Sequence, residues 1–279
     1  MAEPPPPPSP EAVDSGPRAS PSTGPSPGDS YVQSFARGLS VIRSFGAAAP
    51  RQTLTEVAAA TGLSRASARR ILLTLVALGY VQAQGRQFRL TPQTLELGLA
   101  YLGSQPLWSL AGPPMLALAA ELQQSCTVAV LDGREIVCLL NQPGRDTAAP
   151  RPGIGDRLPA ADTAMGQVLL AALDPDERQR RLAAPPFVVY ARHPAADPAT
   201  LQRTIEDVAR QGWALVEREL EDGRGALAAP VNDGIQRTVA ALGLSWQAGR
   251  LPAQHAVERC LPSLLRTAAT LSSLISIRG

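Results

Sequence analysis

The chain has 279 residues, a formal net charge of +2, and 44% hydrophobic and 18% charged residues, which suits one or two folded domains. Its three cysteines, Cys126, Cys138 and Cys260, are an odd number without a CxxC pair, so we expect neither a disulfide framework nor a zinc module, and a cytoplasmic location. We also expect no membrane span, which needs roughly 18 consecutive apolar residues, and no secretory signal.

The charges are unevenly distributed along the chain. Residues 1–30 hold ten prolines, one arginine and four acidic residues, a composition that predicts a disordered tail. Residues 31–102 hold eight arginines against two acidic residues, and all 26 basic residues of the chain are arginine. This basic segment indicates a polyanionic partner, although a solvated charged surface with no partner would show the same balance.

Two helices are predicted at the start of the basic segment. From residue 34 to 45, apolar residues recur at the spacing of one helical face, namely Phe35, Leu39, Ile42 and Phe45. A second helix is expected to open at Thr53, which stands at capping-box spacing from Glu56. Gly62 then breaks this helix, and Ser64 is placed to cap the next one.

The third predicted helix, residues 64–78, sorts its side chains into two faces. One face is apolar and is expected to be buried, with Ala68, Ile71, Leu72, Leu75 and Leu78. The opposite face carries Arg65, Ala66, Arg69 and Arg70 in the first half of the helix. Arginine can donate two hydrogen bonds to guanine, and small residues allow close approach, so this face is typical of a major-groove reader. The alternative is a solvated arginine face on an ordinary helix.

A β-hairpin and a further helix are predicted after this helix. Residues 80–83 and 86–90 are short strand-like runs around a Gln84-Gly85 turn, and a hairpin after a helix-turn-helix is a wing. Arg86 near its tip is expected to contact DNA phosphates or the minor groove. Thr91-Pro92 predicts a helix start, and Leu95, Leu99 and Leu102 form a stripe suited to a linker or dimer helix.

Residues 113–279 are predicted to be α+β, with an antiparallel sheet and surrounding helices that leave room for a small-molecule pocket. The expected strands are 127–131, 135–140, 213–216, 226–231 and 238–246. The expected helices are 115–122, 163–173, a short one from 174, 198–212 and 256–277, the last with Pro262 inside it.

These segments carry a resemblance to a known family. Residues 34–39, 53–58, 65–81 and 88–102 resemble the winged helix-turn-helix of IclR-type bacterial transcription regulators, and within that family the group that controls aromatic-acid catabolism through the β-ketoadipate route. Residues 155–173, 212–223, 226–230 and 240–245 are similar, more weakly, to the family's GAF-like effector-binding domain. The resemblance implies a winged helix-turn-helix joined by a linker helix to an antiparallel-sheet domain.

We therefore expect a tail over 1–30, a DNA-binding domain over 31–90, a linker helix over 91–112 and an effector-binding domain over 113–279. The expected partners are double-stranded operator DNA, a small-molecule effector that is an aromatic or other carboxylic acid, and further copies in a homodimer or dimer of dimers. We expect no cofactor, metal or membrane. The residues assigned to DNA are Thr55, Ser64, Arg65, Ala66, Ser67, Arg69, Arg70 and Arg86. The positions that the resemblance assigns to the ligand are Ala164, Met165, Glu217, Ala226, Gly243 and Ser245.

Three departures from the family pattern bear on the ligand. Ala161 stands where relatives usually have histidine, and Ala226 and Gly243 stand where polar or thiol side chains are common. Fewer donors then face a carboxylate, which implies a different ligand or weak binding. One alternative is a regulator that has lost its ligand response and acts constitutively. Another is an enzyme built on the C-terminal sheet domain, although the sequence has no GxSxG elbow and no phosphate-binding glycine loop, and we expect no enzymatic activity.

Overall fold

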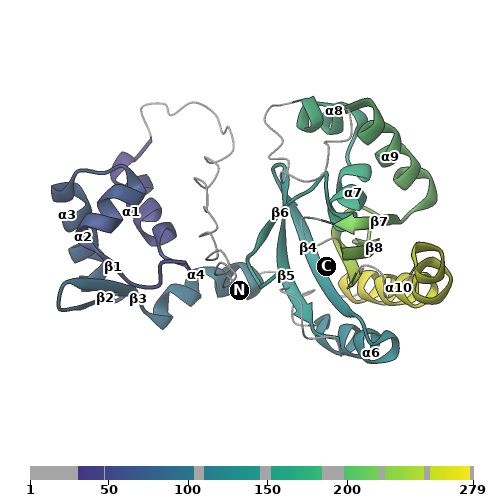
Figure 1. Ribbon diagram of the computed structural model, residues 1–279, viewed down its shortest axis with the longest axis horizontal. Coiled ribbons are helices and arrows are strands. Elements are labelled where there is room, and N and C mark those ends of the chain that lie inside the picture. The colour runs from purple at the N-terminus through teal and green to yellow at the C-terminus, as the bar shows by residue number, and fades with distance from the viewer. Residues whose placement is uncertain are drawn as a thin grey trace, which may run out of the picture. The chain divides into compact units, whose positions relative to one another are not determined.

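The computed structural model describes residues 31–46, 48–103, 110–144, 152–183, 198–219, 224–247 and 252–276 (Figure 1). The predicted tail over 1–30 and residues 104–109 of the predicted linker lie outside the described residues. The residues group into two compact units, one with the chain up to Leu75 and Ala83–Arg89, the other with Val76–Gln82 and the chain from Leu90 on.

The first three helices are α1 (Gln33–Ser44), α2 (Leu54–Thr61) and α3 (Arg65–Ala77). The predicted capping box at the start of α2 is present, because the Glu56 amide donates to the Thr53 hydroxyl and the Thr53 amide donates to the Glu56 carboxylate at 2.6 Å. Gly62 ends α2 with a φ of +66°, in the left-handed region that glycine adopts without strain. These signals are local, and each appears where the sequence placed it.

The buried face of these helices differs in part from the predicted one. The core residues are Val41, Phe45, Val57, Ala58, Ala68, Leu72, Leu75 and Val81. Phe35 and Leu39 of α1, which were predicted to share one helical face, are 68% and 41% exposed. Leu78 after α3 was predicted to be buried but is 57% exposed. Burial in α1 is concentrated at the C-terminal positions, where Val41 and Phe45 are covered, so the N-terminal half of the apolar stripe remains at the surface.

A three-stranded sheet forms from β1 (Gln52–Thr53), β2 (Val81–Gln84) and β3 (Gln87–Leu90), in the order β1-β3-β2. The hairpin turn falls at Gly85-Arg86, one residue later than predicted, with Gly85 at a φ of +61°. β1 was not predicted; Gln52 and Thr53 pair antiparallel with Phe88 and Gln87. The chain continues through a short 3₁₀ turn, η1 (Pro92–Thr94), into α4 (Leu95–Gly103), so the predicted linker begins as a 3₁₀ turn.

The C-terminal domain is built on a six-stranded antiparallel sheet in the order β6-β5-β4-β9-β8-β7 (Figure 1). Its strands are β4 (Ser125–Asp132), β5 (Glu135–Gln142), β6 (Arg157–Pro159), β7 (Ala214–Glu219), β8 (Arg224–Asn232) and β9 (Thr238–Trp246). Its helices are α6 (Gly112–Leu122), α7 (Ala164–Ala171), α8 (Pro175–Ala183), α9 (Pro198–Gln211) and α10 (Ala253–Ser276). β6 is the one strand among these that the sequence analysis did not predict.

The two faces of this sheet carry side chains of different size, because successive strand residues point to opposite faces. The face that packs on α6 and α10 is covered by large residues, including Val128, Leu227, Leu242, Leu244 and Trp246. The face that packs on α7 carries small ones, including Ala129, Ala226, Ala228 and Ala241. In Figure 1, α7 and α10 accordingly lie on opposite sides of β7 and β8. The cluster on the α7 side, which we call the α7 cluster, also holds Ala161, Ala164, Met165 and Val168.

All three cysteines are buried and reduced, and burial raises the pKa of the Cys126 thiol to about 12 and also raises the pKa of Cys260. Because the thiolate is the reactive form, we expect the folded protein to resist a thiol reagent such as 5,5′-dithiobis(2-nitrobenzoate) at pH 8, and the urea-unfolded protein to release three equivalents of chromophore. Rapid stoichiometric labelling of the folded protein would contradict this.

No helix in the described part of the chain is both long and apolar enough to cross a membrane.

Candidate DNA-binding and effector sites

The start of α3 is fixed by a side-chain cap and a glycine turn. The Ser67 amide donates to the Ser64 hydroxyl at 3.2 Å, and the Ser64 hydroxyl donates to the Ser67 hydroxyl at 3.0 Å. Two assigned DNA residues, Ser64 and Ser67, therefore contact each other at the helix N-terminus. Ala68, Leu72 and Leu75 are buried on the opposite side and fix the rotation of the helix.

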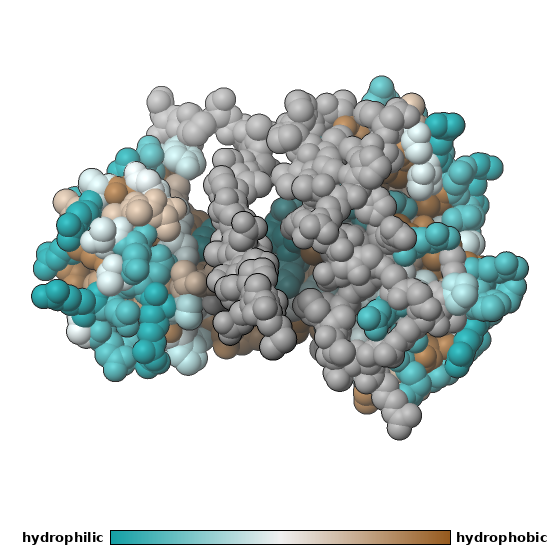
Figure 2. Space-filling view, in the orientation of Figure 1, coloured by the Kyte–Doolittle hydropathy of each residue, from teal (hydrophilic) through white to brown (hydrophobic). Residues whose placement is uncertain are grey.

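The outer face of α3 is exposed and cationic. Arg65, Ala66, Arg69 and Arg70 are all exposed, as predicted from their spacing. None of the three guanidinium groups has an ion pair or hydrogen bond with any residue in the described ranges. On the side where Figure 1 places α3, the surface in Figure 2 carries hydrophilic residues together with some hydrophobic ones. The opposite side of α3 is buried, and these arginines have no partner among the described residues. Their N–H groups are therefore available to donate to an external anion.

Leu73 also belongs to this face, and sequence analysis missed it. It follows Arg69 and Arg70 by four and three residues and is 45% exposed, so it extends the arginine face by one turn. The same spacing that grouped the arginines could have found it. The exposed face of α3 therefore presents arginines over its first two turns and an apolar side chain in the next turn.

The remaining two assigned DNA residues lie on neighbouring elements. Thr55 is exposed in the first turn of α2. Arg86 is exposed in the turn between β2 and β3, and it has no ion pair or hydrogen bond among the residues that the structure describes. β3 pairs with β1, whose Thr53 is also the N-cap of α2, so the hairpin is tied directly to the helix-turn-helix.

Five of the six assigned ligand positions come together in the C-terminal domain. Ala164, Met165 and Ala226 are buried members of the α7 cluster. Gly243 lies against Met165, because a Cβ built on it would be 2.7 Å from the Met165 Cγ. Ser245 is half-buried and pairs with Ala226 across β8 and β9. Glu217 on β7 is exposed and is not a member of the cluster.

Two polar residues beside this cluster were missed by sequence analysis. Gln167 on α7 is 8% exposed and donates through Nε2 to the carbonyl of Ala161 at 3.1 Å, but its Oε1 is buried without a donor among the described residues. Arg178 on α8 is half-buried, and its Nε likewise has no acceptor there. A glutamine within the otherwise apolar run of α7 is a signal that could have indicated the first.

Comparison with known proteins decides the family. The model of the IclR helix-turn-helix domain matches residues 34–85, and the model of the bacterial transcriptional regulator IclR C-terminal domain matches residues 99–273. The chain belongs to the IclR family of bacterial transcription regulators. The first match covers the elements from α1 to β2, and the second covers nearly all of the C-terminal domain.

Within the IclR family, the chain is similar to regulators of aromatic catabolism, as the sequence analysis expected. It is 34% identical to the Pca regulon regulatory protein of Pseudomonas putida, over 86% of this chain and 83% of that protein. It is 32% identical to the p-hydroxybenzoate hydroxylase transcriptional activator of Acinetobacter baylyi, over 88% and 93%. The fold matches the crystal structure of an IclR homologue from Microbacterium hydrocarbonoxydans complexed with 4-hydroxybenzoate, with a TM-score of 0.76, 24% identity and coverage of 87% and 98%.

Proposed function

We propose that this IclR-family regulator inserts the exposed face of α3 into the major groove of operator DNA, with Thr55, Ser64, Arg65, Ala66, Ser67, Arg69 and Arg70 at the contact. The observation that carries this proposal is the set of exposed arginines without partners in the described ranges. Guanidinium groups at successive turns can donate to guanine O6 and N7, while Ala66 allows the helix backbone to approach the base edges. The buried side of α3 fixes its orientation.

Arg86 has a different proposed role, contact with the phosphate backbone. Replacing it with alanine is expected to weaken binding to every DNA sequence by a similar factor and to lower the slope of log affinity against log salt by about one. Affinity is measured by fluorescence anisotropy for an operator duplex and a scrambled duplex at several salt concentrations. A change in base preference instead would show that Arg86 reads bases.

The proposed assembly is a homodimer, with a dimer of dimers as the larger form. Phe35 and Leu39 on α1 are exposed apolar residues, and so are Leu95 and Leu99 on α4, which supports burial of these helices against a second copy. In a two-fold pair, the recognition helices reach successive major grooves about 34 Å apart, so the operator is expected to be palindromic.

The proposed effector is an aromatic or other small carboxylic acid that binds at the α7 cluster, with Ala164, Met165, Glu217, Ala226, Gly243 and Ser245 as the family-derived positions. Support comes from the regulators of aromatic catabolism to which the chain is similar and from the bound 4-hydroxybenzoate of the structural relative. Binding would shift the population of sensor-domain arrangements and thereby change operator affinity. We propose that the protein acts in the cytoplasm and releases its effector unchanged, without catalysis.

Operator retention by the purified full-length protein tests this function. Genomic fragments that the protein retains are sequenced, and retention is then titrated with 4-hydroxybenzoate and short-chain carboxylic acids. We expect palindromic fragments and a retention that responds to at least one acid. Absence of any sequence-selective retention would overturn the DNA-binding proposal, and retention insensitive to every acid would favour the constitutive regulator. Mass spectrometry of the recovered acid distinguishes binding from turnover.

A further inference from the structure

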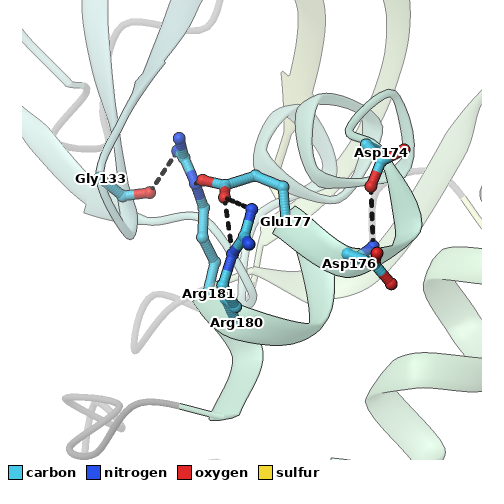
Figure 3. A network of polar contacts seen from close by, with 6 residues as sticks. All are labelled: Gly133, Asp174, Asp176, Glu177, Arg180 and Arg181. Carbon is cyan, nitrogen blue, oxygen red and sulfur yellow. Dashed lines mark hydrogen bonds and ion pairs between the residues drawn. The ribbon is translucent and has the colours of Figure 1, made fainter.

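The three arginines of α8 are paired unequally. Both Arg180 and Arg181 donate to the Glu177 carboxylate, at 2.7 Å from Arg180 Nη2 and 2.7 Å from Arg181 Nε (Figure 3). Hydrogen bonds from Arg181 and then Arg180 lower the pKa of Glu177. Arg181 also donates through Nη1 to the carbonyl of Gly133 at 2.8 Å, in the turn between β4 and β5. The carboxylate of Glu177 is thus bound by Arg180 and Arg181, two of the three arginines of α8.

Arg178 is the arginine of α8 that has no acidic partner among the described residues. Its Nη2 donates to the Leu173 carbonyl at 3.3 Å, and its Nε is buried with no hydrogen-bond partner in the described part of the chain. No carboxylate of the described residues lies within ion-pair distance of it. A guanidinium group that is partly withdrawn from water, with one N–H unsatisfied, is costly unless an anion neutralises it. The position therefore favours a bound anion.

The packing of α8 places this group beside the α7 cluster. Arg178 precedes Arg181 by three residues and Leu182 by four, so the three share one face of the helix. Leu182 packs against the α7 cluster, and so does Leu173, whose carbonyl Arg178 binds. Ala164, Met165 and Ala226 belong to that same cluster. Arg178 is therefore a cation at the margin of the surface that holds the family-derived ligand positions.

We propose that Arg178 binds the carboxylate of the effector. The inference rests on the proposed function and names the residue that recognises the acid group. The small residues of the sheet face and the flexible thioether of Met165 would contact the apolar part of the ligand. The Oε1 of Gln167 needs a donor, which a hydroxyl group on the ligand could provide. The favoured ligand class is a hydroxy-substituted aromatic acid.

Calorimetric titration of the full-length protein tests this assignment with 4-hydroxybenzoate, benzoate and the neutral 4-hydroxybenzamide. The variants are Arg178→Gln, Arg178→Lys and, as the matched control, Arg180→Gln, whose arginine side chain is 72% exposed. We expect Arg178→Gln to weaken binding of the two acids by about 10- to 100-fold, the loss of a hydrogen bond between charged groups, and to leave the amide nearly unchanged. Arg180→Gln should change acid binding by no more than about twofold, because surface ion pairs contribute little.

Equal affinity of wild type and Arg178→Gln for the acids would overturn the assignment and leave the regulator function intact. Failure of every acid to bind the wild type would also overturn it, and operator retention by the same preparation then shows whether the DNA-binding function stands. If Arg178→Gln does not fold, judged from its melting temperature, Arg178→Lys decides. The ammonium group of Arg178→Lys keeps the charge but lacks the planar guanidinium, so this variant should lower the ratio of acid affinity to amide affinity. An unchanged ratio would refute the proposal.

Discussion

Replacing Arg69 or Arg70 with alanine is expected to weaken operator binding by about 1–3 kcal/mol each, roughly 5- to 150-fold. Both side chains are exposed on the outer face of α3 and make no ion pair among the described residues, so the free protein should lose no folding contact in either variant. The loss should fall on specific sequence positions and relax the base preference there, because a bidentate contact to guanine is removed. Anisotropy titrations against operators with single base-pair changes measure it.

Arg259→Ala is the matched control for the arginine variants. It removes the same charge from an exposed position on α10 in the C-terminal domain and should change operator affinity by far less. Unchanged binding isotherms for both Arg69→Ala and Arg70→Ala would remove the recognition-helix assignment. A loss equal to that of Arg259→Ala would show that net charge, and not the face of α3, determines affinity.

Gly166→Ala is expected to destabilise the C-terminal domain by about 3 kcal/mol. Gly166 lies inside α7 and is buried, and a Cβ built on it would clash with the carbonyl oxygen and the Cα of Ala160. The obstacle is backbone, so a side chain cannot rotate away, and α7 would have to move off the segment that follows β6. The better helix propensity of alanine, worth about 1 kcal/mol, is too small to offset this.

Urea denaturation followed by tryptophan fluorescence measures this effect, since the buried Trp246 lies in the same domain. Gly234→Ala is the control, because its added Cβ would be 3.6 Å from Ser276, an ordinary contact, and its φ is not positive. Because α7 carries Ala164 and Met165, Gly166→Ala should lose the proposed acid binding at a urea concentration where operator binding is still measurable. An unfolding midpoint equal to that of Gly234→Ala would show that the approach of α7 to Ala160 contributes little to stability.

Local signals predicted much of this fold, because the interactions that they reflect lie within a few residues of the chain. The capping box of Thr53, the glycine end of α2 and the Ser64 cap of α3 are examples. β1 and β6 were missed because two or three residues carry no periodic pattern. Their strand character comes from partners 34 to 36 residues away for β1 and 20 to 24 residues away for β6. The burial of Leu78 was predicted wrongly, because periodicity identifies an apolar face but not what covers it.

The candidate sites show the same division. The exposed arginine face of α3 followed from the rotation of about 100° per residue within one helix. The role of Arg178 could not be predicted in this way. It depends on the hydrogen bonds of Glu177 with Arg180 and Arg181, and on which side of α8 packs against the α7 cluster. A sequence shows three arginines and nearby acids, which predicts three surface ion pairs as readily as one unpaired cation.

Thr53 occupies two structural roles at once. Its hydroxyl and amide close the first turn of α2, while its backbone pairs with Gln87 in the strand that follows Arg86. A displacement of the hairpin therefore cannot occur without disturbing α2, which the turn at Gly62 joins to α3. Groove contact and backbone contact should consequently be gained and lost together as the protein engages DNA, and dissociation should proceed as a single kinetic phase.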